Sequence, residues 1–131
     1  MANVSKLLAL SILLLGAGER VLAGVPLDGP AGVAWHEPTR SWFVSNTGPA
    51  GENAGRIARL DAGDKRADPY WLKGLHRPRG IAAAGDRLYV AEEKALAVID
   101  IGTRAIIARH RIDEARRLHG VAADDAGNVY V

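Results

Sequence analysis

Four polar residues in this 131-residue sequence have side chains suited to ligand chemistry: Asn46, Arg79, Glu92 and His119. Asn46 and Glu92 each follow a short apolar run, whereas Arg79 and His119 each precede a glycine that opens such a run. An arginine guanidinium suits a carboxylate or phosphate, and a histidine can serve as an acid or base near neutral pH. These residue types predict a rim that binds an anionic or sugar-like ligand.

A second interpretation of the same four residues involves no ligand. Asn46 and Glu92 would close hairpin turns, and Arg79 and His119 would be solvated loop residues. The sequence contains no Ser-His-Asp order with a nucleophile elbow, so no catalytic residue is assigned. The choice between the two interpretations depends on the elements that position these side chains.

Those elements recur along the chain. The segments "GPAGVAW", "RPRGIAA" and "LHGVAAD" contain Gly32, Gly80 and Gly120, roughly 40 to 50 residues apart, and a period of this size is typical of propeller blades. A polar turn and a second apolar run, "WFVSN", "LYVAE" or "VYV", follow each segment. The small residues beside each glycine suit an innermost strand, where blades crowd the axis.

Each unit is predicted to contain four short strands. In the first unit the strands span 32–36, 41–46, 56–61 and, weakly, 69–72; in the second they span 80–84, 87–92, 95–101 and 105–112. The fold class is therefore all-β, a β-propeller of four-stranded blades within residues 24–131, with blade 1 at about 30–73, blade 2 at about 78–112 and a partial blade 3 at about 118–131. A β-sandwich also has short, evenly spaced strands, but it does not require the Pro-x-Gly and Tyr-Val pairs to recur in step.

This architecture predicts where the four residues lie. The start of a blade's first strand and the end of its second strand share one edge, because the two strands are antiparallel. Asn46, Arg79, Glu92 and His119 should therefore lie on one rim of the propeller, together with Ala31.

About two and a half blades are present, whereas propellers usually have about 4–8. We expect the chain to be the N-terminal fragment of a longer propeller. The alternative is that several copies assemble into a ring, so an oligomer is expected only if the chain is complete.

Residues 1–23 have the layout of a secretory signal peptide, expected to be helical. Lys6 precedes an apolar run from Leu7 to Leu15, and Val21 and Ala23 have the spacing that signal peptidase reads. The alternative of a membrane anchor requires about 20 apolar residues. We expect a periplasmic or secreted protein with no membrane association after cleavage.

Composition excludes several function classes. The 17 Lys and Arg nearly balance the 15 Asp and Glu, which argues against nucleic acid as a partner. The basic cluster "ARHRIDEARRLH", residues 108–119, is expected to be a solvated edge. Because the chain has no cysteine, disulfides, thiolate zinc sites and thiol catalysis are impossible.

In the blocks "GPAGVAW…WFVSNTG", "GRIARLDAGDK", "YWLKGLHRPRGIA", "DRLYVAEEKALAVID" and "GVAADDAGNVYV", the sequence resembles the senescence-marker-protein/gluconolactonase/LRE-like family of propellers, and NHL-like propellers as well. It is especially similar to an exported bacterial branch of that family. The resemblance covers nearly all of residues 24–131.

The resemblance implies a divalent cation, calcium or zinc, at one mouth of the channel of a complete propeller. There the metal polarises a lactone carbonyl and helps to activate water. This chain departs from the family pattern at two places: Ala31 stands where the first metal-binding Glu is expected, and His119-Gly120 replaces a substrate-facing Asn-Asp. No metal ligand is therefore assigned in this chain.

The sequence predicts a gluconolactonase-like propeller segment that is a ligand- or partner-binding scaffold with an incomplete metal site. Its expected partner is a small sugar-like or anionic molecule or a protein. The alternative is a metal-dependent sugar-lactone hydrolase whose remaining ligands lie on blades absent from this chain. A purely structural role, through assembly at open strand edges, is a third class.

Overall fold

A computed structural model describes residues 26–51, 53–63 and 66–131. The signal-peptide helix predicted for residues 1–23 lies outside these ranges. Within them the chain forms strands and turns but no helix, and hence none that could cross a membrane.

Two antiparallel four-stranded sheets follow one another along the chain, each with its strands in sequence order. Blade 1 consists of β1 (Pro30–His36), β2 (Ser41–Asn46), β3 (Gly55–Asp61) and β4 (Ala67–Leu75). Blade 2 consists of β5 (Ile81–Ala84), β6 (Arg87–Ala91), β7 (Ala95–Asp100) and β8 (Ala105–Arg111). A two-stranded hairpin, β9 (Ala122–Ala123) with β10 (Val129–Tyr130), follows.

The predicted strands are all present, and the largest difference is at β4. This strand has nine residues, whereas only 69–72 was predicted. Register shifts against β3 between Gly55 and Arg56 and between Ile57 and Arg59 interrupt the pairing. Because bulges break the two-residue alternation of a strand, the apolar pattern revealed only the middle of β4.

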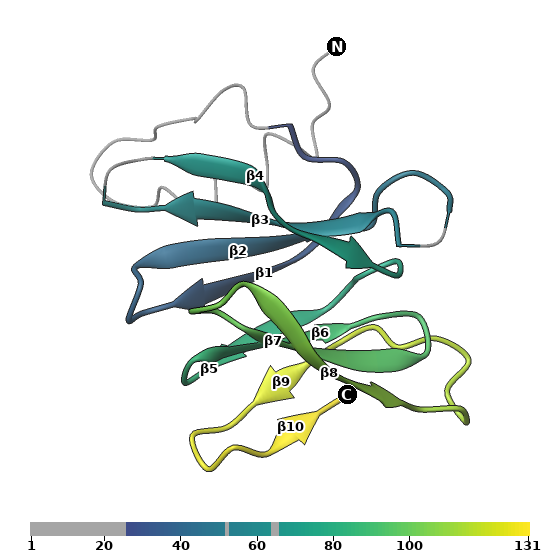
Figure 1. Ribbon diagram of the computed structural model, residues 1–131. Helices are drawn as coiled ribbons and strands as arrows, with labels where there is room; N and C mark the ends of the chain where they lie inside the picture. The colour runs from purple at the N-terminus through teal and green to yellow at the C-terminus, as the bar shows by residue number, and fades with distance from the viewer. Residues whose placement is uncertain (1–25, 52, 64–65) are drawn as a thin grey trace.

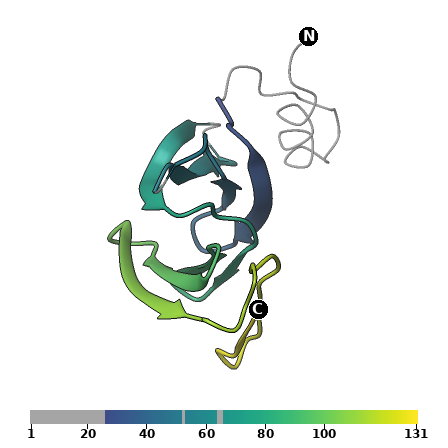
Figure 2. The same ribbon diagram turned by 90° about the vertical axis from the view of Figure 1, so that its right-hand side faces the viewer.

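The two sheets stack face to face, with the β9–β10 hairpin beyond blade 2 (Figure 1). In the turned view the outer strands β4 and β8 lie on one side of the stack and β1 lies on the other (Figure 2). The inner strands β1, β5 and β9 are consecutive neighbours in space. This radial arrangement of four-stranded sheets is the predicted propeller architecture.

The main core lies between the two blades. Phe43 and Trp71 of blade 1 pack edge to face with their ring centroids 4.8 Å apart, in the same cluster as Leu88 and Ile99 of blade 2. A smaller cluster on the other face of blade 1 includes Leu27, just before β1. Apolar burial between the sheets thus fixes how blade 2 sits on blade 1.

The repeated glycines lie where inner strands approach each other. A Cβ on Gly32 would come within 2.6 Å of the Arg79 carbonyl oxygen, and a Cβ on Gly80 within 2.2 Å of the His119 carbonyl oxygen. Gly120 has open space at the corresponding point within the described chain. The prediction that these glycines occupy matching places beside the axis is confirmed for Gly32 and Gly80.

Candidate functional site

We call Ala31, Arg79 and His119 the axial rim. Ala31 is the second residue of β1, and Arg79 and His119 lie in the short segments that lead into β5 and β9. Ala31 is exposed at the β-bulge between Pro30 and Gly32. The Gly80 amide donates a hydrogen bond to the His119 carbonyl oxygen at 2.7 Å, which joins two strand starts. The structure therefore places Arg79 beside the start of the next blade. Within the described ranges, the side chains of Arg79 and His119 have no hydrogen-bond or ion-pair partner.

Asn46, at the end of β2, is fully buried. Its Oδ1 accepts a hydrogen bond from the Asp28 amide at 3.0 Å, and its Nδ2 donates one to the Val44 carbonyl oxygen at 3.0 Å. The side chain therefore anchors the segment that leads into blade 1, and none of it is exposed for a ligand.

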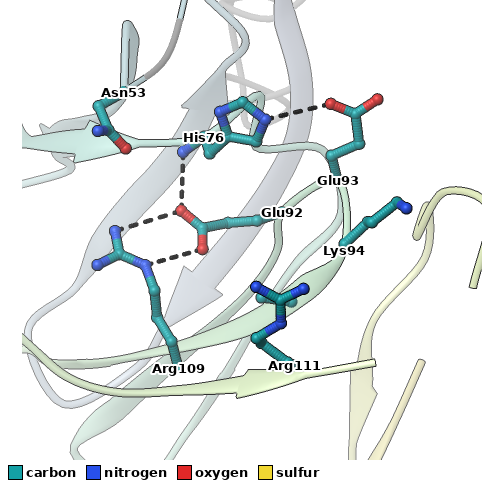
Figure 3. Close-up of a pocket in the computed structure, with 8 residues that line it drawn as sticks. Asn53, His76, Glu92, Glu93, Lys94, Arg109 and Arg111 are labelled. Atoms are coloured by element: carbon teal, nitrogen blue, oxygen red, sulfur yellow. Dashed lines mark hydrogen bonds and ion pairs between the residues drawn. The ribbon is translucent and has the colours of Figure 1, made fainter. Parts of the chain in front are cut away.

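Glu92, directly after β6, is only 2% exposed. Its Oε1 accepts a hydrogen bond from the His76 amide at 2.7 Å, and Arg109 Nε donates to its Oε2 at 2.9 Å (Figure 3). A second Arg109 nitrogen, Nη2, donates to Oε1 at 3.4 Å and to the Gly74 carbonyl oxygen at 2.8 Å. Bidentate arginine–carboxylate pairing of this kind is strong and directional. Both Glu92 oxygens are therefore occupied by the chain itself.

An open pocket of about 730 Å³ surrounds this ion pair at the edge where blades 1 and 2 meet (Figure 3). We call it the interblade pocket. It is lined by Asn53, His76, Glu92, Glu93, Lys94, Ala95, Arg109 and Arg111. These residues come from the β2–β3 loop, the segment after β4, the β6–β7 turn and β8, so both blades contribute.

The other charged groups of the interblade pocket differ in their pairing. Glu93 lies 3.2 Å from His76 Nε2 and 3.9 Å from Arg117 Nη2. Arg111 pairs with Asp113 at 2.8 Å in an exposed ion pair. Within the described ranges, the side chains of Lys94 and Asn53 have no polar partner. Among the described residues, the pocket thus contains one cationic group and one amide without a polar partner.

Two aspartates at the opposite edge of the blades have turn-capping roles. The Thr103 backbone amide, followed by its hydroxyl, lowers the pKa of Asp100 in the β7–β8 turn. The Asn128 side-chain amide, followed by its backbone amide, lowers the pKa of Asp124 in the β9–β10 turn. In both cases the donors stabilise the charged carboxylate, as expected of turn caps.

The described residues contain no group of three or more His, Asp or Glu arranged to hold a metal ion. Ala31 has no donor atom, Asn46 and Glu92 are engaged by the chain, and His119 stands apart from any carboxylate partner in the described ranges. The described residues of these blades therefore offer no donor set that fits a divalent cation.

Sequence reasoning identified Glu92 but missed Arg109, His76 and the pocket. Arg109 was part of the cluster expected to be a solvated edge; its side chain is 41% exposed, yet its guanidinium binds buried Glu92. The available signal was an acidic residue directly after an apolar strand, since a carboxylate that becomes buried there needs a cation. Which of several nearby arginines supplies it is not encoded locally.

No family model matches this chain, and neither does any curated protein. Several solved structures are similar to it, among them the following three. A chain of a nidogen/laminin complex aligns with a TM-score of 0.61 at 20% identity, over 80% of this chain and 38% of that chain. Hydrazine synthase from Kuenenia stuttgartiensis aligns with a TM-score of 0.60 at 18% identity, over 86% of this chain and 31% of that chain. A gluconolactonase from Xanthomonas campestris aligns with a TM-score of 0.60 at 19% identity, over 86% of this chain and 37% of that chain.

The chain thus spans between three and four tenths of each of these proteins. At such identities the likeness concerns the fold, and it agrees with the two stacked four-stranded sheets. The chain has the β-propeller fold.

Proposed function

We propose that this chain is part of a propeller that binds a small anionic, sugar-like ligand at the axial rim. The observation that supports the proposal is that the four candidate residues differ in burial and in hydrogen bonding. Asn46 and Glu92 are buried and engaged by backbone groups, whereas Arg79 and His119 lie at adjoining strand starts without partners in the described ranges. What remains available at the mouth is a guanidinium and an imidazole, which suit a carboxylate with neighbouring hydroxyl groups.

The ligand site in this proposal is shared with further blades. Gly32 and Gly80 each meet the next inner strand, and Gly120 has open space where a following strand would lie. Further blades from the same polypeptide, or from other copies of it, would supply the rest of the mouth. The molar mass of the full-length protein in solution, measured by light scattering, distinguishes one long chain from a ring of copies.

Calorimetric titration of the full-length protein with gluconate tests the binding proposal. Arg79→Ala and His119→Ala should each weaken binding by about tenfold, the loss expected for one charge-assisted hydrogen bond. Arg87→Ala is the matched control, because Arg87 is exposed at the other end of blade 2. If Arg79→Ala binds gluconate as well as Arg87→Ala does, the axial rim is not the binding site.

A second candidate is a metal-dependent lactone hydrolase, and the likeness to a gluconolactonase favours it. Its cation would be calcium or zinc, held by residues outside these blades. Hydrolysis of D-glucono-δ-lactone by the full-length protein, with calcium, zinc or manganese added, is the test. Turnover that chelator abolishes and metal restores supports the enzyme, and its absence with all three metals rejects it.

We also propose that residues 1–23 are a secretory signal and that the protein acts in the periplasm or outside the cell. The apolar run after Lys6 and the small residues at Val21 and Ala23 support this proposal. Mass spectrometry of the protein recovered from cell fractions should show a chain that begins at Gly24. An intact N-terminus on cytoplasmic protein would contradict it.

A further inference from the structure

The interblade pocket is separate from the axial rim. Its lining lies on the β6–β7 turn, the outer strand β8, the segment after β4 and the β2–β3 loop, whereas the axial rim lies at the inner strands. All of its lining residues belong to blades 1 and 2. The two described blades are therefore enough to form it.

The charges of this pocket leave an unpaired cation. Glu92 is matched by Arg109, Glu93 lies between His76 and Arg117, and Arg111 pairs with Asp113. Both side chains of that last pair are about 70% exposed, and such surface ion pairs contribute little to stability. Arg111 can therefore exchange Asp113 for a ligand. Lys94 has no counter-charge among the described residues, so the pocket favours an anion.

The pocket also contains groups that recognise hydroxyls. The Asn53 amide can donate and accept, and it has no polar partner in the described part of the chain. Glu93 contributes carboxylate oxygens, and their side-chain partners in the described part of the chain are His76 Nε2 at 3.2 Å and Arg117 Nη2 at 3.9 Å. A volume of about 730 Å³ matches pockets for small organic molecules and exceeds what a lone ion needs.

We propose that the interblade pocket is a second binding site, for a small anion that carries hydroxyl groups. The anionic group contacts Lys94 and Arg111, and the hydroxyl groups contact Asn53 and Glu93. The Glu92–Arg109 pair forms the rigid floor, because it is held by the His76 amide and the Gly74 carbonyl oxygen. A sugar phosphate and a sugar carboxylate share this chemistry.

Titration of the full-length protein, followed by calorimetry and by the NMR signals of the Asn53 side-chain amide, tests the proposal. The probes are glucose 6-phosphate, gluconate, inorganic phosphate and glucose. Glucose 6-phosphate or gluconate should shift the Asn53 signals and bind at least tenfold more tightly than glucose or phosphate, and the tighter of the two identifies the anionic group. Equal affinity for phosphate and glucose 6-phosphate would overturn the proposal, because the pocket would then recognise charge alone.

Matched variants locate the site. Lys94→Ala should weaken binding of the better probe by about tenfold or more, as expected for loss of a charged hydrogen bond, and Asn53→Ala should weaken it less. Lys73→Ala removes an exposed lysine of β4 that stacks on Tyr70 and should not alter this binding. Arg79→Ala removes the axial cation, and the ligand-induced shifts of the Asn53 signals should persist in this variant even where the axial rim binds gluconate less tightly. Equal losses for Lys94→Ala and Lys73→Ala would reject the pocket. Loss only in Arg79→Ala would assign the anion to the axial rim, which separates the two proposals.

Discussion

Blades 1 and 2 have different polar residues at the position where the second strand ends. Asn46 follows the second strand of blade 1, and Glu92 follows the second strand of blade 2. Each side chain is buried and accepts a backbone amide from the segment that leads into its own blade, Asp28 in one case and His76 in the other. The position therefore calls for a buried acceptor, and an amide or a carboxylate can meet that need.

The difference in charge has a structural consequence. The neutral Asn46 is satisfied by two backbone groups, whereas the carboxylate of Glu92 also requires a cation, which Arg109 supplies from the outer strand. Burial of an unpaired charge is costly, so the partner follows from the choice of Glu over Asn. The interblade pocket forms around this ion pair in blade 2.

The largest expected effect comes from removing the cation of blade 2. Arg109→Met should lower the free energy of unfolding by about 2–3 kcal/mol, below the full value for a buried pair because Arg109 is 41% exposed. Urea denaturation measures it. Adding Glu92→Gln should recover much of the lost stability, because the buried acceptor of blade 2 is then a neutral amide, as Asn46 is in blade 1. No recovery in the double variant would mean that Arg109 acts through packing rather than charge.

The glycines provide the next comparison. Gly32→Ala should cost about 2 kcal/mol, because its Cβ would overlap the Arg79 carbonyl oxygen within the stacked blades. For the described blades by themselves, Gly120→Ala should leave stability within about 0.5 kcal/mol, since its Cβ meets open space in the described chain, whereas a following blade of the proposed propeller would raise this cost. Thermal melts of both variants provide the measurement. A large loss in Gly120→Ala would indicate that another strand packs there.

A smaller effect is expected at the neutral site of blade 1. Asn46→Ala removes the acceptor of the Asp28 amide and should cost about 1 kcal/mol, because that amide lies in an exposed segment that water can reach. Denaturant unfolding should show a loss below that of Arg109→Met. A larger loss would mean that the leading segment is held through Asn46 alone.

The smallest effect concerns pH and the β9–β10 turn. The pKa of Asp124 is lowered from 3.8, so its carboxylate stabilises the turn at pH values above 3.8. This contribution to stability is lost as the pH falls below 3.8 and passes through the lower pKa that Asp124 has in the folded chain. Amide exchange at Ala126 and Asn128, which both donate to Asp124, should then accelerate relative to blade 1. The Asp124→Asn variant should lack this pH dependence.

The strands and their order were predictable because each depends on local features. The short apolar runs around Phe43 and Val90, each preceded by a polar turn, indicated strands, and Gly85 and Gly127 have the positive φ that their turns require. Asp86 and Asn128, which follow these glycines in the two turns, do not have positive φ values. β4 was underestimated because its bulges break the apolar pattern on which the prediction relied.

The candidate site was predictable only in part. Glu92 was recognised as a polar residue at a strand end. Its burial and its ion pair with Arg109 depend on where the outer strand β8 lies relative to the β6–β7 turn. Arg79 and His119 were expected on one rim, and the hydrogen bond from Gly80 to the His119 carbonyl oxygen brings their strand starts together. A rim position by itself does not determine whether a side chain faces a ligand or the blade.

The sequence by itself determined the all-β class, the four-stranded unit and the glycines beside the axis, because strand periodicity, turn chemistry and the absence of a Cβ are properties of adjacent residues. Only the tertiary structure decided which polar side chains are buried and which remain available. Strand pairing within blade 2 brings Arg109 to Glu92, and the stacking of the two blades places Asn53 and Lys94 at one pocket. The partner of a charge depends on distances across the fold, and residue spacing along the chain does not contain those distances.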